Sequence, residues 1–179
     1  MTAEEIIALI DAADPISAAA GLAQPTEVTW SRTAHPADWL VDGDVEGDID
    51  AHRAAHVAGR PTEAVVRYGA GTSPTQVGIR IAALAELARE SDLLRSVHLV
   101  PGEDSSERPG SWGVEDLVVT AAARQAMPHV TIRPDWERLG APACQVAVAF
   151  GASDWLIPAD DDADPEHLAH AVGVRAVAR

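Results

Sequence analysis

The chain is poor in several residue types on which whole classes of proteins depend. Its single cysteine, Cys144, allows no disulfide within the 179 residues and fits a reducing compartment. Aromatic residues make up only 4%, while alanine is abundant, which favours packed helices over a β-sandwich. Basic residues are also few, since 13 Lys and Arg against 28 Asp and Glu give a net charge of −15. That charge disfavours nucleic-acid and anionic-membrane partners, because phosphate is repelled at long range.

Long apolar runs are missing as well. None approaches the roughly 20 residues that a membrane-spanning helix needs. The first residues, MTAEEII, are acidic where a secretory signal is basic, so we expect a cytoplasmic protein. An apolar fraction of 47% is enough for a core. Because the length is that of one domain, we expect a single domain over residues 1–179.

Strand-like and helix-like segments alternate along the chain with short connections. Thr2 and Glu5 have the spacing of a capping box and begin a leader helix over 1–23, bent at Pro15. Strands are predicted at 26–30, 63–69, 96–100, 129–133, 155–158 and 174–178. A loop is predicted at 36–44, and helices at 45–58, 74–91, 114–127, 136–152 (broken near Gly140) and 165–172. The alternation predicts an α/β fold with parallel strands, either an open doubly wound sheet or part of a (β/α) barrel.

The segment VVRYGAGTSPTQ, residues 65–76, runs from an apolar stretch into two glycines. It lacks both the G-x-G-x-x-G spacing and the G-K-[ST] ending of phosphate-binding loops. Gly69 and Gly71 would either let a ligand approach the backbone or form the turn before a helix. The second interpretation is favoured, with Ser73 as the helix cap and Pro74 at the first position.

Two pairs of histidines have the spacing of metal ligands. His52 and His56 lie four residues apart on one predicted helical face, with Asp48 one turn earlier. The alanines between the two histidines indicate ordinary helix packing, and a third ligand must come from elsewhere, so no metal is expected. His167 and His170 follow the acidic run at 160–162, which we interpret as a solvated turn.

No catalytic residue is assigned from the sequence. Asp154 is expected at the amino end of a strand, where it would contribute to stability. No Ser-His-Asp order, nucleophile elbow or Cys-His arrangement can be assembled.

Three longer segments follow one pattern. Residues 51–91, AHRAAHVAGRPTEAVVRYGAGTSPTQVGIRIAALAELARES, contain a His-Arg-x-x-His helix, a strand ending in Tyr-Gly and a second helix. Residues 114–155 contain Ala-Arg, Pro-His-Val, Leu-Gly and Phe-Gly-Ala-Ser-Asp, and residues 164–179 form a helix followed by a strand. In combination they resemble the radical S-adenosylmethionine enzymes of the futalosine route to menaquinone. These are aminofutalosine synthase and dehypoxanthine futalosine cyclase, with the related deazaflavin-cofactor (FO) synthases.

The resemblance implies the C-terminal part of a (β/α) TIM-type barrel, half to three quarters complete, behind a leader helix. It also implies that the family's chemistry is lost. Those enzymes hold a 4Fe-4S cluster on Cys-x-x-x-Cys-x-x-Cys, which this sequence lacks, and one thiolate cannot replace three. Their strand-end His and Glu fall on Ala70 and Thr72. We therefore expect no cofactor on this chain alone, with cluster and S-adenosylmethionine present only if a partner supplies the missing half.

The first functional hypothesis is a non-catalytic accessory protein of menaquinone biosynthesis. A partial barrel leaves two open sheet edges, so we expect a homodimer or docking to a full-length homologue. A split enzyme, whose missing half is a separate polypeptide, is a further alternative. Five tryptophans would suit either such a surface or the core: Trp30, Trp39, Trp112, Trp136 and Trp155.

The second hypothesis is a small-molecule binding protein or enzyme that uses the remaining barrel loops. Nucleoside-like or anionic ligands would meet side chains near the carboxyl ends of the strands. The candidate residues are Arg67, Tyr68, His98, Arg133 and Trp136. The structural alternative is that Arg67 and Arg133 pair with some of the surplus carboxylates.

Overall fold

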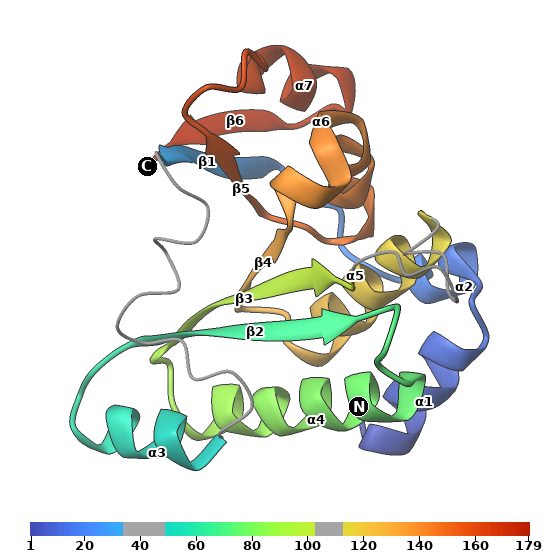
Figure 1. Ribbon diagram of the computed structural model, residues 1–179, viewed down its shortest axis with the longest axis vertical. Coiled ribbons are helices and arrows are strands. Elements are labelled where there is room, and N and C mark those ends of the chain that lie inside the picture. The colour runs from blue at the N-terminus through green and yellow to red at the C-terminus, as the bar shows by residue number, and fades with distance from the viewer. Residues whose placement is uncertain (34–48, 103–112) are drawn as a thin grey trace.

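All six predicted strands form. The computed structural model describes residues 1–33, 49–102 and 113–179 (Figure 1). The strands are β1 (Glu27–Thr33), β2 (Thr62–Tyr68), β3 (Leu94–Pro101), β4 (Thr131–Pro134), β5 (Asp154–Pro158) and β6 (Arg175–Ala178). Every pairing is parallel, and the strands form two three-stranded sheets in the orders β2-β3-β4 and β5-β1-β6. The predicted α/β fold with parallel strands is therefore confirmed.

The two sheets follow one another around an arc (Figure 1). They meet at Ser153, whose N–H donates to the Ile132 carbonyl at 2.9 Å. The Ile132 N–H in turn donates to Ser153 Oγ at 3.1 Å, so a side chain replaces the next ladder bond. β2 and β6 lie at the two ends of the arc and are not paired with each other in the described part of the chain. β1 lies between β5 and β6, whereas a sequential barrel keeps strands in chain order.

Helices lie on the convex side of the arc (Figure 1). They are α3 (Ile49–Val57), α4 (Pro74–Glu90), α5 (Val114–Ala126), α6 (Trp136–Ala147), the short 3-10 helix η2 (Val148–Phe150) and α7 (Pro165–Ala171). The predicted break in α6 is confirmed, because Gly140 has φ 74° and ψ 168°. Residues 34–48, which include the predicted loop at 36–44, the start of the helix at 45–58 and Asp48, lie outside the described residues. None of the described helices is both long and apolar enough to cross a membrane.

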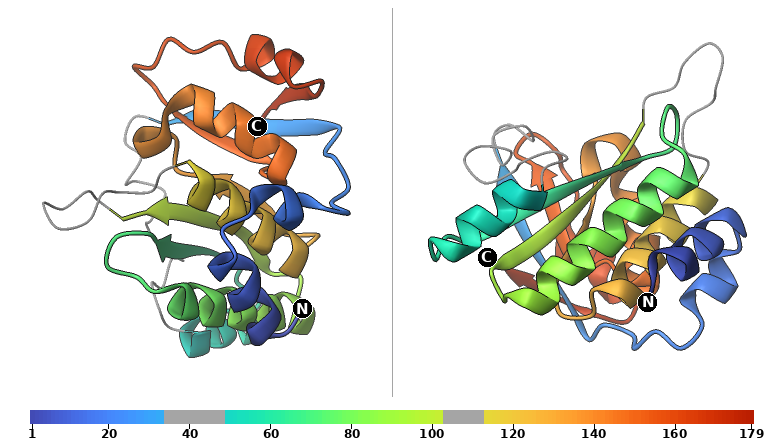
Figure 2. Two further views of the ribbon diagram at one scale, coloured as in Figure 1. Left: turned by 90° about the vertical axis from the view of Figure 1, so that its right-hand side faces the viewer. Right: turned by 90° about the horizontal axis from the view of Figure 1, so that it is seen from below.

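The leader consists of two helices rather than one bent helix. Thr2 and Glu5 form the predicted capping box of α1 (Ala3–Asp11). The chain then turns at Ala13, with φ 49°, and Asp14 caps α2 (Pro15–Ala19). Both helices pack on the outer side of α4 and α5 (Figure 2). Gly78 of α4 permits this, because a Cβ at that position would lie 3.1 Å from the Ile7 backbone nitrogen.

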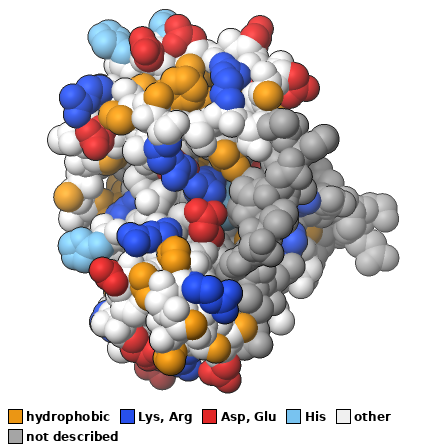
Figure 3. All heavy atoms as spheres, turned by 90° about the vertical axis from the view of Figure 1, so that its left-hand side faces the viewer, with side chains coloured by type: hydrophobic (Ala, Val, Ile, Leu, Met, Phe, Trp, Pro, Cys, Tyr) orange, Lys and Arg blue, Asp and Glu red, His pale blue; other side chains and the backbone are white. Residues whose placement is uncertain are grey.

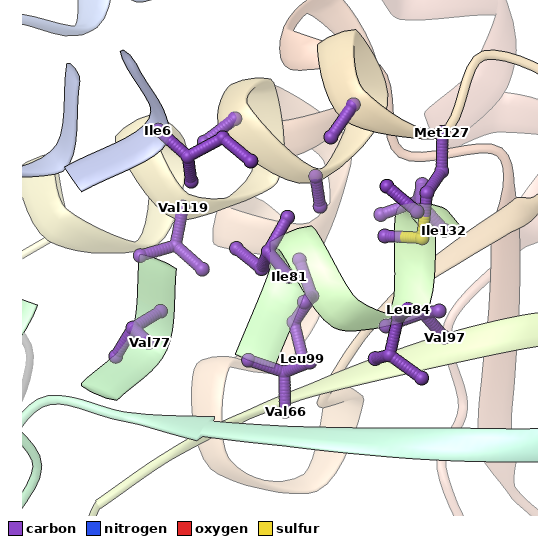
Figure 4. Packing of buried hydrophobic residues seen from close by; sticks show 14 of the residues in the cluster. Ile6, Val66, Val77, Ile81, Leu84, Val97, Leu99, Val119, Met127 and Ile132 are labelled. Carbon is purple, nitrogen blue, oxygen red and sulfur yellow. The ribbon is translucent and has the colours of Figure 1, made fainter. Parts of the chain in front are cut away.

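The larger hydrophobic core lies between the β2-β3-β4 sheet and helices α4 and α5 (Figure 4). Alternate side chains of each strand enter it, as the two-residue period of a strand requires. From β2 these are Ala64, Val66 and Tyr68; from β3, Val97 and Leu99; and from β4, Ile132. The intervening residues of the same strands therefore face the concave side of the arc.

The smaller core lies between the β5-β1-β6 sheet and helices α6 and α7. Trp136 and Trp155 pack edge to face there, with ring centroids 5.8 Å apart, and Trp30 packs against the same cluster. Cys144 is buried beside them, and burial raises the pKa of its thiol, which keeps it protonated. Three of the five tryptophans thus have core positions, while Trp39 and Trp112 lie outside the described residues.

The glycines after β2 form the predicted turn. Gly69 and Gly71 have φ of 81° and 87°, a region that L side chains rarely adopt. Ser73 then caps α4 through a capping box with Gln76, and Pro74 occupies the first helical turn. The interpretation of residues 65–76 as a strand, a turn and a helix start is confirmed. The glycines allow the chain to turn from β2 into α4.

Candidate functional site

The concave side of the β2-β3-β4 sheet carries charged side chains. In the strand register Val65 lies beside His98, and His98 lies beside Arg133. Arg67 follows Val65 on the same side of β2, because every second residue shares a side. Three of the five residues predicted as ligand contacts, Arg67, His98 and Arg133, therefore lie together on this face.

A buried ion pair connects this face to the second sheet. Arg133 Nε donates to Asp154 Oδ2 at 2.6 Å, across the junction between β4 and β5. The Arg133 side chain is 3% exposed and the Asp154 side chain is fully buried. Arg133 Nη1 also lies 3.4 Å from Glu63 Oε2 on β2. One guanidinium thus contacts carboxylates from both sheets.

Asp154 collects further partners from the neighbouring strands. Thr29 Oγ1 on β1 donates to Asp154 Oδ1, and Arg179, next to β6, forms an ion pair with Asp154 Oδ2. Asp154 stands at the first position of β5, as expected for a stabilising residue at the amino end of a strand. The predicted position of Asp154 at the amino end of a strand is therefore confirmed. Its partners come from β4, from β1 and from the residue after β6, so this carboxylate of β5 connects four strands.

His98 lies in a positively charged environment. Burial lowers the pKa of His98 well below its ordinary value. The guanidinium charges of Arg133, Arg138 and Arg67 lower this pKa further. All 13 basic residues of the chain are arginines, and several gather around one acidic side chain on this side of the molecule (Figure 3). At neutral pH His98 is therefore an uncharged imidazole among permanent cations.

Two of the predicted ligand contacts do not reach this face. The Tyr68 side chain enters the larger core, where its hydroxyl donates to Asp116 Oδ1 at 2.7 Å. Burial and the Asp116 charge raise the pKa of that phenol well above its usual range. Trp136 belongs to the smaller core, and its Nε1 donates to Asp161 Oδ2 at 2.8 Å. Both side chains stabilise the fold instead of lining the concave side.

His52 and His56 converge on a hydroxyl group. His52 Nδ1 and His56 Nε2 lie 2.9 and 2.8 Å from Thr62 Oγ1, and Ser91 Oγ lies 3.0 Å from His56 Nδ1. This chain of hydrogen bonds attaches α3 to β2 and to the end of α4. Burial lowers the pKa of His56, which favours its neutral form. Among the described residues no three His, Cys, Asp or Glu side chains are grouped as metal ligands.

Asp160, Asp161 and Asp162 lie in the connection between β5 and α7, where Asp161 stabilises a turn. Asp161 accepts hydrogen bonds from the Trp136 indole and, at 2.8 Å, from the Ala163 N–H. These bonds lower the pKa of Asp161, so its carboxylate is the stable form. His167 and His170 lie exposed on α7. The interpretation of this run as a turn is consistent with these contacts.

Sequence reasoning missed the partners that complete the site. Glu63 and Thr29 have no local motif, and Arg179 lies at the end of a short strand. Only the strand order brings these residues to Arg133 and Asp154. The alternation of strand residues would have placed Glu63 with Arg67 on one side of β2, but not across the sheet junction.

The buried ion pair generates a first prediction. In Asp154→Asn, Arg133 and Arg179 lose their shared carboxylate, so the free energy of unfolding should fall by about 3–5 kcal/mol in urea denaturation. Glu27→Gln is the matched control, since it breaks the exposed 2.7 Å pair with Arg175 and should cost at most about 1 kcal/mol. Equal losses in the two variants would contradict the central role of Asp154.

His98 generates a second prediction, on pH. Above about pH 6.5 it is neutral in both the folded and unfolded states. Below that pH the unfolded chain takes up a proton that the folded protein resists, so the free energy of unfolding falls until the lowered folded pKa is reached. His98→Gln should make this fall shallower in urea titrations between pH 5 and 7, by up to about 1.4 kcal/mol per pH unit. The slope of the unmutated protein is the reference, and an unchanged slope in His98→Gln would refute the assignment.

None of the protein families compared with this chain matches it, and no curated protein matches it either. The resemblance to the futalosine-route enzymes therefore rests on the quoted segments alone.

Proposed function

We propose that this protein binds a small anionic, nucleoside-like molecule on the concave side of its sheets. The observation that carries the proposal is the gathering of Arg67, Arg133 and Arg138 around a buried, neutral His98. Arg133 also pairs with Asp154 and Glu63, and Arg138 pairs with Asp135, as the structural alternative predicted for Arg133. Arg67 is exposed on β2 beside them. Guanidinium groups recognise carboxylate and phosphate through paired hydrogen bonds, and an uncharged imidazole accepts or donates one more.

A second polar group supports the same location. Ser96 precedes His98 by two residues, so both side chains lie on the concave side of β3. The Ser96 side chain is 2% exposed, and its Oγ has no hydrogen-bond partner among the described residues. A buried hydroxyl without a partner is costly, and a ligand hydroxyl or oxyanion would satisfy it.

If the strands form part of a barrel, the proposed binding site lies in the barrel interior. We infer that the six strands belong to a partial (β/α) barrel, because β2, β3, β4 and β5 follow in chain order with helices on the convex side. The concave side then corresponds to the barrel interior. The place of β1 between β5 and β6 is the departure from a sequential barrel. On this interpretation the chain acts in the cytoplasm as a binding domain without radical chemistry of its own.

The binding site generates a third prediction. Titration with adenosine monophosphate, adenosine and inorganic phosphate, followed by isothermal calorimetry, should show the monophosphate binding most tightly. Arg67→Gln removes one charged donor and should weaken that binding about tenfold. Arg60→Gln is the control, because Arg60 is exposed in the turn before β2. No measurable binding of any probe, or equal weakening in the two variants, would refute the proposal.

A second candidate function is an accessory role beside a full-length radical enzyme. β2 and β6 each pair with one strand only in the described part of the chain, and an exposed strand edge is a template for another chain. The same edges would serve a homodimer, or the separate half of a split enzyme carrying the cluster.

This candidate generates a fourth prediction. Light scattering of the purified protein at micromolar concentration should report a dimer, because association through the open edges covers both of them. A monomer that stays monomeric in the presence of a full-length futalosine-route enzyme would contradict the accessory role. That result would leave the small-molecule proposal unaffected, since its site lies within one chain.

A further inference from the structure

A cavity lies at the amino-terminal edge of the strands. It has a volume of about 660 Å³ and adjoins the amino ends of β1, β4 and β5. One wall is the connection between α2 and β1, residues 20–26, and the other is the end of α5 with the loop that follows it. The volume falls within the range of small-molecule sites in proteins. Nothing in the arrangement around Arg133 and Asp154 uses this cavity.

Arg124 forms part of the inner wall. Its Nε donates to the Gly151 carbonyl at 2.9 Å, and its Nη1 donates to the carbonyls of Pro128 and Val130 at 2.8 and 3.0 Å. Its Nη2 donates to Ser153 Oγ at 2.9 Å, which anchors it to the junction between the two sheets. These partners are neutral. No Asp or Glu in the described part of the chain lies within ion-pair distance of Arg124.

The charge of Arg124 is therefore fixed in place but not neutralised. Burial lowers its pKa, which is the cost of removing the cation from water, and no carboxylate offsets that cost. Its position is fixed because five carbonyl or hydroxyl oxygens, including the Met127 carbonyl at 3.4 Å, accept hydrogen bonds from the guanidinium group. A fixed, partly desolvated cation attracts an anion more strongly than a mobile surface arginine does.

The other residues that line the cavity would also accommodate an anion. The charged or titratable side chains of the lining are Arg124 and His129, and the lining includes no Asp or Glu, although acidic residues outnumber basic ones 28 to 13 in the chain. The amide groups of Gln24 and Gln125 and the hydroxyl of Thr131 offer hydrogen bonds. Leu22, Pro25 and Val130 add apolar surface.

We propose that this cavity binds a small organic anion, with a carboxylate or phosphate group directed toward Arg124 and an apolar part against residues 22–25. The site is distinct from the one on the concave side, and the leader connection forms its outer wall. Binding there would hold the leader helices against the sheet junction, because the ligand would contact both.

The test introduces charge at the rim of the cavity. Gln24 is exposed, and its amide makes one long hydrogen bond, 3.3 Å to the Ala149 carbonyl, so its replacement leaves the fold intact. Succinate, phenyl phosphate and inorganic phosphate serve as probes, and amide chemical shifts in nuclear magnetic resonance spectra locate the binding. We expect the largest shifts at Gln24, Arg124 and His129. Phenyl phosphate binding tighter than succinate would identify phosphate as the preferred group, and the reverse order would identify carboxylate.

Two charge variants sharpen the test. Gln24→Glu should weaken binding about tenfold and Gln24→Arg should strengthen it, because the added charge lies at the ligand site. Gln76→Glu is the matched control: it makes the same chemical change in the capping box of α4, where Glu serves as well as Gln. The proposal is overturned if no probe shifts these amides at millimolar concentration, or if Gln24→Glu and Gln76→Glu weaken binding equally. Since Arg67→Gln acts only on the concave side, the outcomes for the two sites are distinguishable.

Discussion

The contact between Arg133 and Asp154 holds this structure together. Two short parallel sheets meet at β4 and β5, where the ladder of backbone hydrogen bonds is interrupted at Ser153. A buried ion pair at 2.6 Å crosses that interruption and is extended by Thr29, Glu63 and Arg179. Without it, the buried Arg133 would keep only its longer contact with Glu63 among the ion pairs described, and the buried Asp154 would keep Thr29 and Arg179. The arc of strands, and with it the concave polar side, depends on this contact.

The sequence predicted the elements well and their arrangement only in part. Short apolar segments such as VRAVA and SVHLV located the strands, and the capping signals at Thr2 and Ser73 located the helix starts. Strand segments and helix caps depend on residues that are close in sequence, so the sequence alone can reveal them. The insertion of β1 between β5 and β6 depends on contacts between distant segments, for which one sequence contains no pattern.

The same limit applies to the candidate site. Arg67, His98 and Arg133 were predictable because each stands in a strand that helices follow. Tyr68 and Trp136 were predicted with them from their positions near strand ends, yet each turns into a hydrophobic core. Strand alternation separates Tyr68 from Arg67, and Trp136 is the first residue of α6, where it lies buried in the smaller core with Cys144. The paired histidines resembled a metal site because their spacing is right, but Thr62, ten residues from His52, provides the shared partner.

The position of β1 has a consequence for how the chain acquires its shape. Among the described residues β1 pairs with β5 and β6, so this first of the six strands has no sheet partner until β5 has been synthesised. The β2-β3-β4 layer with α4 and α5 is complete before then, and its contacts are closer in sequence. We therefore expect the β2-β3-β4 sheet to form first during synthesis and the β5-β1-β6 sheet to form last. β1 and β6, the first and last of the six strands in chain order, are neighbours in one sheet, so deleting either strand removes a member of the same sheet.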